Sequence, residues 1–284
     1  MKVLLLTHRY SGSDGHSTVI NNVALALIKK NIHVVIASYN FIKDPPEIIP
    51  KLDLSLKDIL YFKKISKQFD IIHNFQTLMN YVSIFSSSPF LFHYLGSGTL
   101  LQSINLKFSS YITNKNIEKY FVSSSVSANE LYKITHKISD IVPLAISDIF
   151  FKNINKINKK GNPQLLTITR FMDYKKNEDL LFAFKHLLVK FPNANLQIIG
   201  QGPKINQIKN LIDREKLMPN VELLGLIDHE SLQENYNSCD LYISTSSKEA
   251  FPLPVLECMA VGKPMILSDI AIHKEIIQQS NGGL

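Results

Sequence analysis

The sequence predicts an α/β protein with two domains, each built around a parallel β-sheet. Short β-branched runs alternate with amphipathic stretches along the chain, which is typical of parallel sheets covered by helices. The 284 residues exceed one average domain of about 100–150 residues. Residues 151–163 are rich in Lys and Asn, and the same rhythm restarts after them. We therefore expect a first domain at 1–150, a linker at 151–163 and a second domain at 164–284.

The first domain opens with a βαβ pattern. Val3–Thr7 is an apolar run, a polar turn around Gly15 follows, and apolar residues then recur at helical spacing as far as Ile28. His33–Ser38 is the next β-branched run. Further strands are expected at 70–74, 90–93, 120–123 and 138–142.

The second domain repeats this alternation after Pro163. Strands are expected at 165–169, 195–199, 221–224, 240–245 and 264–267, with helical patterns between them. The chain then stops at 281–284, where a further strand and helix would be expected. The second domain is therefore expected to be compact or incomplete at its C-terminal end.

The composition is that of an ordinary globular protein, with 45% hydrophobic and 19% charged residues. No apolar run approaches the roughly 20 residues that a membrane-spanning helix needs. Cys239 and Cys258 form neither a disulfide framework nor a metal-ligand pattern, so we expect two buried thiols in a reducing, cytoplasmic setting.

The net charge of +7 is concentrated in the first domain, where 15 Lys and Arg face 10 Asp and Glu. The basic residues gather in two groups: Lys63, Lys64 and Lys67, then Lys107, Lys115 and Lys119. A solvated face, a nucleic-acid surface and a dock for an anionic membrane are all compatible with this charge. The aromatic-interleaved basic stripe that single-stranded nucleic acid requires is absent from the sequence, which disfavours the second alternative.

Ligands of open parallel sheets bind outside the carboxyl ends of the strands, so the strand-to-helix turns are the candidate sites. In the turn after 240–245, Glu249 precedes a helix that Pro254 is suited to begin, and Glu257 lies about one turn inside it. Two carboxylates near a helix end suit paired hydroxyls of a sugar or ribose. The alternative is a pair of capping acids on a solvated first turn.

The turn after 165–169 carries Arg170 and, five residues later, Lys175. Two cations that converge on a crevice suit a diphosphate, because Arg offers a bidentate fork and Lys a point charge. Ordinary surface cations are the alternative.

Two weaker candidates lie in the first domain. Gly15 follows the first strand and would let the backbone approach a ligand, although an ordinary glycine turn is the alternative. His93 lies at the end of a strand, and His73 holds the equivalent place on another. Both could equally be structural.

Together these turns resemble the family-4 retaining glycosyltransferases of the GT-B fold. Glu249 and Glu257 stand in SSKEAFPLPVLECMAVGKPMIL, which is similar to the family's paired-glutamate stretch, and TRFMDYKKNEDLL is similar to its basic loop. The resemblance covers the whole chain and is most specific at 240–267. It implies two Rossmann-like domains with an inter-domain cleft.

The resemblance also implies residue roles. Arg170 and Lys175 would bind the donor diphosphate, Glu249 the transferred sugar, and Glu257 the ribose. His93 would approach the donor sugar. The remaining donor-binding residues would be Gly15, Ala250, Phe251 and Leu253.

The implied activity is retaining transfer from a nucleoside-diphosphate sugar to a glycan or lipid-linked acceptor, in cell-surface polysaccharide or glycolipid synthesis. No cofactor, metal or nucleic acid is implied, and the expected location is the cytoplasm with peripheral membrane contact. The alternative is a non-catalytic or partner-dependent nucleotide-binding protein.

The sequence departs from the family pattern at several glycines. Thr169 and Lys176 replace the glycines that flank the basic loop, Ala250 replaces the glycine after the first glutamate, and Pro252 stands where another is common. We expect these changes to narrow the pocket or to alter donor preference.

Overall fold

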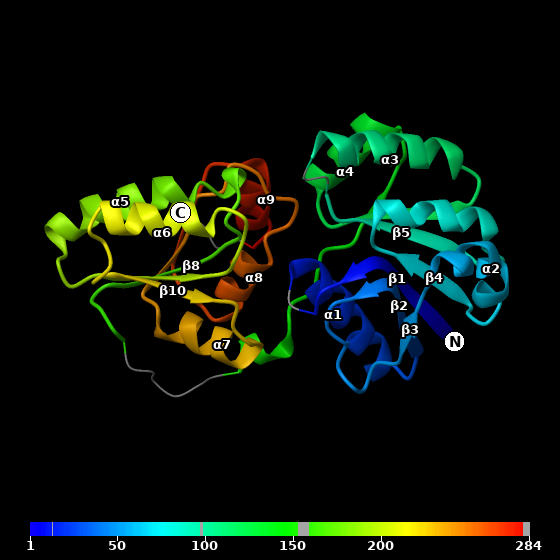
Figure 1. Ribbon diagram of the computed structural model, residues 1–284, viewed down its shortest axis with the longest axis horizontal. Coiled ribbons are helices and arrows are strands. Elements are labelled where there is room, and N and C mark those ends of the chain that lie inside the picture. The colour runs from blue at the N-terminus through cyan, green and yellow to red at the C-terminus, as the bar shows by residue number, and fades with distance from the viewer. Residues whose placement is uncertain (13, 97–98, 153–158, 281–284) are drawn as a thin grey trace. The chain divides into compact units, whose positions relative to one another are not determined.

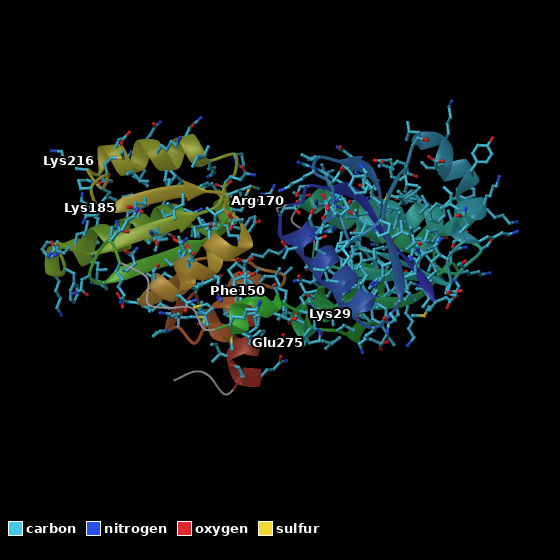
Figure 2. The ribbon with its side chains drawn as sticks, turned by 90° about the horizontal axis from the view of Figure 1, so that it is seen from below. Lys29, Phe150, Arg170, Lys185, Lys216 and Glu275 are labelled. Atoms are coloured by element: carbon cyan, nitrogen blue, oxygen red, sulfur yellow. The ribbon has the colours of Figure 1, made fainter. Side chains whose placement is uncertain are left out.

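The computed structural model describes residues 1–12, 14–96, 99–152 and 159–280. It forms two compact units, Met1–Ala145 and Ile146–Leu284, and the predicted α/β class with parallel sheets is confirmed. Part of the expected linker (153–158) and the last residues (281–284) lie outside the described residues. The division falls before Phe150, which is buried in the second unit with its ring centroid 5.8 Å from that of Tyr236 (Figure 2).

Within the described residues, the first unit has one parallel sheet of seven strands in the order β3-β2-β1-β4-β5-β6-β7. The apolar run that predicted the first strand is buried throughout at Val3–Leu6, as expected of a central strand. The strand bounds are β1 (Lys2–Tyr10), β2 (His33–Phe41), β3 (Lys51–Asp53), β4 (Ile71–Asn74), β5 (Phe90–Tyr94), β6 (Ile117–Val122) and β7 (Asp140–Ile141).

Helices cover both faces of this sheet. Figure 1 shows α1 on one face and α3 and α4 on the other. On that second face α2 packs beside η1, and η1 packs beside α3. The helix bounds are α1 (Gly15–Lys29), α2 (Leu56–Ser66), η1 (Thr77–Phe85), α3 (Leu100–Ile112) and α4 (Ser125–Thr135).

In its described part, the second unit has one parallel sheet of five strands in the order β10-β9-β8-β11-β12. All five expected strands are present within a residue or two of their predicted bounds. These bounds are β8 (Gln164–Ile168), β9 (Asn195–Ile199), β10 (Val221–Gly225), β11 (Leu241–Ser244) and β12 (Met265–Leu267).

Figure 1 shows α5 and α6 on one face of the second sheet and α7 on the other. The first face buries a core of apolar side chains that includes Leu181, Phe184 and Ile198. The helix bounds are η2 (Asp148–Phe151), η3 (Asp173–Lys175), α5 (Asn177–Lys190), α6 (Ile205–Arg214), α7 (His229–Ser238), α8 (Leu253–Ala260) and α9 (Ala271–Ser280). The helix α8 begins one residue before Pro254, which therefore occupies its second position instead of the expected first.

Candidate functional site

Two loops of the second unit meet where the strand order reverses. The chain passes from β8 to β9 on one side, while β11 lies on the other side of β8, so the carboxyl ends of β8 and β11 flank a topological switch point. The β8 loop (residues 169–176) and the β11 loop (residues 245–252) are joined there by hydrogen bonds. The Ser247 amide donates to the Tyr174 carbonyl at 2.7 Å, and the Thr245 hydroxyl donates to the Lys175 carbonyl at 3.0 Å.

The two loops also share an ion pair between Lys175 and Glu249. Both side chains are largely buried, with 15% and 12% of their surfaces exposed. Removing one partner of a buried pair leaves an uncompensated charge, which is strongly destabilising. The cation and the carboxylate that the sequence singled out in separate turns are therefore one constellation.

Arg170 lies two residues after the end of β8, and it is exposed. Figure 2 shows it at the end of the sheet remote from Lys185 and Lys216. Its carbonyl accepts a hydrogen bond from the Met172 amide at 2.7 Å, which bends the chain away from the strand. A second cation thus stands at the same strand end as Lys175.

A glycine pair that the sequence analysis missed holds this strand end in place. A Cβ on Gly200, whose φ is +137°, would lie 1.7 Å from the Thr169 carbonyl oxygen, and one on Gly202 would lie 2.6 Å from the Phe171 amide nitrogen. Only glycine lets the loop after β9 pass so close to the β8 loop. The signal in the sequence is Gly-Gln-Gly directly after an apolar strand.

Glu257 lies in α8 and is 5% exposed. Burial raises its pKa from 4.5 to about 7, against the opposing effect of the Tyr236 hydroxyl, which donates to Glu257 Oε2 at 2.9 Å. The same hydroxyl lies 2.9 Å from the Pro254 carbonyl. This side chain is thus not a solvated capping acid, and Tyr236 of α7 is a partner that the sequence did not reveal.

His273, also missed, stands near the ion pair. Its Nδ1 lies 2.9 Å from the Ser268 carbonyl oxygen, which can only accept, so Nδ1 carries the proton and Nε2 is an acceptor. That Nε2 is buried and has no hydrogen-bond partner among the described residues. Burial lowers the pKa of His273, while Glu249 raises it and Lys175 lowers it, so the ring is neutral and within electrostatic reach of both.

The other expected donor-binding residues of this unit line the start of α8. Ala250 and Phe251 are half-buried in the β11 loop, and Leu253 is the buried first residue of the helix. Pro252 is the N-cap and is itself buried. The β11 loop therefore approaches α8 with apolar side chains on both sides of the turn.

In the first unit, His93 lies in β5 and stacks on His73 of β4, with ring centroids 5.7 Å apart and planes 10° apart. Burial lowers the pKa of His73 to about 3 and that of His93 to about 4. The electrostatic effect of His16, in α1, lowers the pKa of His93 further. The Nε2 atoms of all three are buried without a hydrogen-bond partner in the part of the chain described. The structure therefore holds two stacked, neutral histidines near the carboxyl ends of β4 and β5, with His16 of α1 within electrostatic reach of His93.

Gly15 is the first residue of α1, after the N-cap Asp14, which accepts a hydrogen bond from the Ser17 amide at 2.8 Å. A Cβ at Gly15 would meet nothing within 4 Å. The protein itself therefore does not require glycine at this position.

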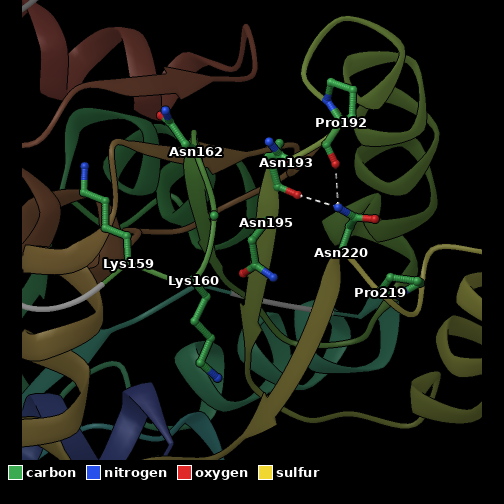
Figure 3. A pocket seen from close by; sticks show the side chains of 10 residues that line it. Lys159, Lys160, Asn162, Pro192, Asn193, Asn195, Pro219 and Asn220 are labelled. Carbon is green, nitrogen blue, oxygen red and sulfur yellow. Dashed lines mark hydrogen bonds between the residues drawn. The ribbon is translucent and has the colours of Figure 1, made fainter.

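A hollow of about 600 Å³ lies at the opposite, amino ends of β8, β9 and β10 (Figure 3). Its two lysines are already paired, Lys159 with Asp240 and Lys160 with Glu222. We therefore do not assign a ligand to it. Among the described residues, no three His, Cys, Asp or Glu side chains are grouped as metal ligands would be, and no helix is both long and apolar enough to cross a bilayer.

Parts of the chain are similar in sequence to known proteins. An uncharacterized glycosyltransferase of Haemophilus influenzae is 26% identical over 163 residues, which are 57% of this chain and 45% of that protein. The alpha-monoglucosyldiacylglycerol synthase of Streptococcus pneumoniae is 24% identical over 188 residues, covering 61% of this chain and 42% of the synthase. The chain thus spans less than half the length of these relatives.

The solved structure of Anabaena HepE in complex with UDP and glucose has a TM-score of 0.80 with this chain at 15% identity, covering 97% of this chain and 83% of HepE. This likeness confirms the GT-B fold that the resemblance implied. The family model described as glycosyl transferases group 1 matches residues 149–284, which include both loops of the site. Residues 149–284, slightly less than half of the chain, are therefore similar to the domain that this family model describes.

Proposed function

We propose that this chain is a retaining glycosyltransferase that moves a sugar from a nucleoside-diphosphate sugar to a glycan or lipid-linked acceptor. The observation that carries the proposal is the Lys175–Glu249 ion pair at the switch point, with Arg170 at the same strand end. Two of the similar proteins support it. One is named an alpha-monoglucosyldiacylglycerol synthase, and HepE was solved in complex with UDP and glucose. Cell-surface polysaccharide or glycolipid synthesis on the cytoplasmic side is the proposed setting.

The proposed roles follow from charge and burial. Arg170 and Lys175 would hold the diphosphate, and they would stabilise the charge that it gains as the bond to the sugar breaks. Glu249 would accept hydrogen bonds from sugar hydroxyls. Glu257, whose carboxyl is oriented by the Tyr236 hydroxyl, would accept hydrogen bonds from the ribose hydroxyls. These two cations would supply the neutralisation without a metal ion.

Retention requires the acceptor oxygen to bond to the sugar carbon on the face from which the diphosphate leaves. The leaving oxygen takes the electron pair of the broken bond, and it can accept the proton that the acceptor hydroxyl loses. His93 and Gly15 remain the proposed donor-side residues of the first unit. Ala250, Phe251 and Leu253 would pack against the donor in the second.

The test combines thermal stability with release of nucleoside diphosphate. A donor at 100 times its dissociation constant should stabilise the chain by about 2.7 kcal/mol, which a melting curve detects. The panel is the UDP, GDP and ADP sugars, each with wild type, Lys175→Met and Glu257→Ala. Lys185→Met is the matched control, because Lys185 also pairs with a glutamate, Glu215, but lies away from the site.

One donor should stabilise wild type and the control but neither site variant, and wild type should release diphosphate when an acceptor is present. Stabilisation without any release would favour the non-catalytic, nucleotide-binding alternative. If no donor stabilises a cooperatively melting chain, the proposal fails.

A further inference from the structure

The helix α3 of the first unit is amphipathic in the opposite sense to an ordinary surface helix. Apart from Leu106, its buried side carries small hydroxyl residues, while most of its large apolar residues lie on the solvent side. Helices of globular proteins normally bury the apolar stripe and expose the polar one. The outer face of α3 consists of Leu100, Leu101, Ile104, Phe108, Tyr111 and Ile112, whose side chains are between 41% and 84% exposed.

The buried side of α3 contributes one large apolar side chain, Leu106, to the core, and the hydroxyl residues around it are hydrogen-bonded within the helix. Ser109 donates to the Leu106 carbonyl at 3.1 Å, Ser110 to the Lys107 carbonyl at 2.8 Å, and Thr113 to the Ser109 carbonyl at 2.8 Å. These small side chains, hydrogen-bonded within their own helix, let α3 pack closely between η1 and α4. The large apolar side chains are therefore exposed because of how the helix packs.

The neighbouring helices on this side of the sheet also expose large apolar side chains. The helix η1 exposes Leu78, Ile84 and Phe85, and α2 exposes Leu56 and Tyr61. Since η1 packs against both α2 and α3, these side chains belong to one side of the first unit.

The charge of this side is positive. No Asp or Glu occurs between Asp70 and Glu118, a stretch that includes η1 and α3, whereas Lys107 lies in α3 and Lys115 just beyond it. The helix α2 and the residue after it add exposed lysines at 57, 63, 64 and 67. Two copies of this face brought together would set lysines against lysines, which disfavours self-association.

From these observations we propose that the outer face of α3 docks on an anionic lipid surface. An interfacial helix has large apolar side chains on one face and lysines beside it, and it lies in the plane of the membrane. The thirteen residues of α3 are too few to span a bilayer. Each lysine near an anionic leaflet strengthens the attraction, within about one Debye length. The inference concerns binding alone and does not rest on the proposed transfer.

The sequence contains no tryptophan, so a single introduced tryptophan reports only its own surroundings. We would place one at the outer face with Phe108→Trp and one in the second unit with Val189→Trp, a position that is 85% exposed on α5. The probes are vesicles of phosphatidylcholine alone and of phosphatidylcholine mixed equally with phosphatidylglycerol. Emission of the Phe108→Trp protein should shift to the blue with the mixed vesicles only, less so at high salt, and the Val189→Trp protein should not respond.

A second measurement guards against a perturbing tryptophan. Ile104→Glu combined with Phe108→Glu should reduce flotation with the mixed vesicles by about tenfold or more, because two apolar side chains no longer enter the lipid. Val189→Glu combined with Met218→Glu is the control, since both side chains are exposed in the second unit, and it should float like wild type.

Several outcomes would overturn the proposal. Wild type that does not float with the mixed vesicles has no such surface. Flotation unaffected by the two glutamates would place the contact elsewhere. A blue shift of the Phe108→Trp protein on concentration without vesicles would instead show that two copies meet at this face. No donor or acceptor is present in either measurement, so these results are independent of those that test the transferase.

Discussion

Glu257 is a carboxylate whose burial controls its charge. At 5% exposure its main partner is one hydroxyl, that of Tyr236, and its pKa rises from 4.5 to about 7 because the charged form is poorly solvated. Between these two pH values the folded chain holds a proton that the unfolded chain has lost. Folding stability should therefore fall as the pH rises from about 4.5 to about 7, and the effect of Glu257 is constant above that.

We expect Glu257→Gln to remove this loss, since the amide keeps an oxygen for Tyr236 but never ionises. The variant and wild type should be equally stable at pH 4.5. At pH 8 the variant should be more stable by up to about 3 kcal/mol, at about 1.4 kcal/mol per pKa unit. Denaturant unfolding at both pH values measures the difference.

The opposite sign is expected for Glu215→Gln, which serves as the control. The pKa of Glu215 is lowered, first by the Lys185 side chain and then by Arg214, so its contribution is present above its ordinary pKa and is lost in acid. This variant should be less stable than wild type at pH 8 and equal to it well below pH 4.5. A Glu257→Gln variant that is no more stable than wild type at pH 8 would show that the buried carboxyl is solvated.

At the scale of elements, the junction between η3 and α5 contains one of the four positions where this chain replaces a glycine of the family pattern. Of these four residues, the one at the junction has an unusual backbone conformation. Lys176 is the N-cap of α5 and has a φ of +51°, in the left-handed region that glycine adopts without strain. The left-handed helical conformation costs a side chain of this kind roughly 1–2 kcal/mol. The backbone of the basic loop thus keeps the form that suits glycine, although the residue is lysine.

Lys176→Gly should relieve this strain and stabilise the chain by roughly 0.5–1 kcal/mol, after allowing for the larger entropy of unfolded glycine. Its melting temperature would rise by a few degrees at most. Lys209→Gly is the control, an exposed site inside α6, where glycine should destabilise by roughly 1 kcal/mol. Equal losses at both sites would mean that Lys176 is not strained.

Strand positions were the most predictable part of the fold, because a buried parallel strand needs a run of β-branched residues. The strand β3 escaped prediction since Lys51–Asp53 is short and polar at both ends. Glu249, Lys175 and Arg170 could be chosen from sequence because parallel strands bring their carboxyl ends to one edge. Tyr236 and His273 could not, since they reach Glu257 and the ion pair from helices that no local spacing connects to them.

At the scale of the whole molecule, the two units share a design without sharing a sequence repeat. Each has its own core, and in each the first strand is flanked by the second and the fourth in chain order. The described residues Arg170, Lys175, Glu249 and Glu257 all belong to the second unit. Donor binding should therefore stabilise the second unit more than the first, to which only the proposed contacts of His93 and Gly15 belong.

Calorimetry should then show two transitions, and a nucleoside-diphosphate sugar should raise the transition of the second unit by more than that of the first. Tryptophan fluorescence, followed while the Phe108→Trp and Val189→Trp proteins are heated, assigns each transition to a unit, because each tryptophan lies in one unit only. At 100 times its dissociation constant the donor should stabilise the second unit, whose unfolding the Val189→Trp protein reports, by about 2.7 kcal/mol. Inorganic phosphate at the same concentration is the control and should leave both transitions in place. Equal shifts of both transitions would mean that the units unfold together.

The ion pair in the second unit also determines which anions an empty site can admit. Lys175 is already neutralised by Glu249, so an anion that takes Lys175 alone leaves a largely buried carboxylate without its partner. Orthophosphate brings further negative charge beside that carboxylate and only one or two P–OH groups that could donate to it. A ligand that carries hydroxyl groups beside its phosphates satisfies both residues together. Under the proposed function, the resting site would thus discriminate against small inorganic anions and remain available to a sugar nucleotide.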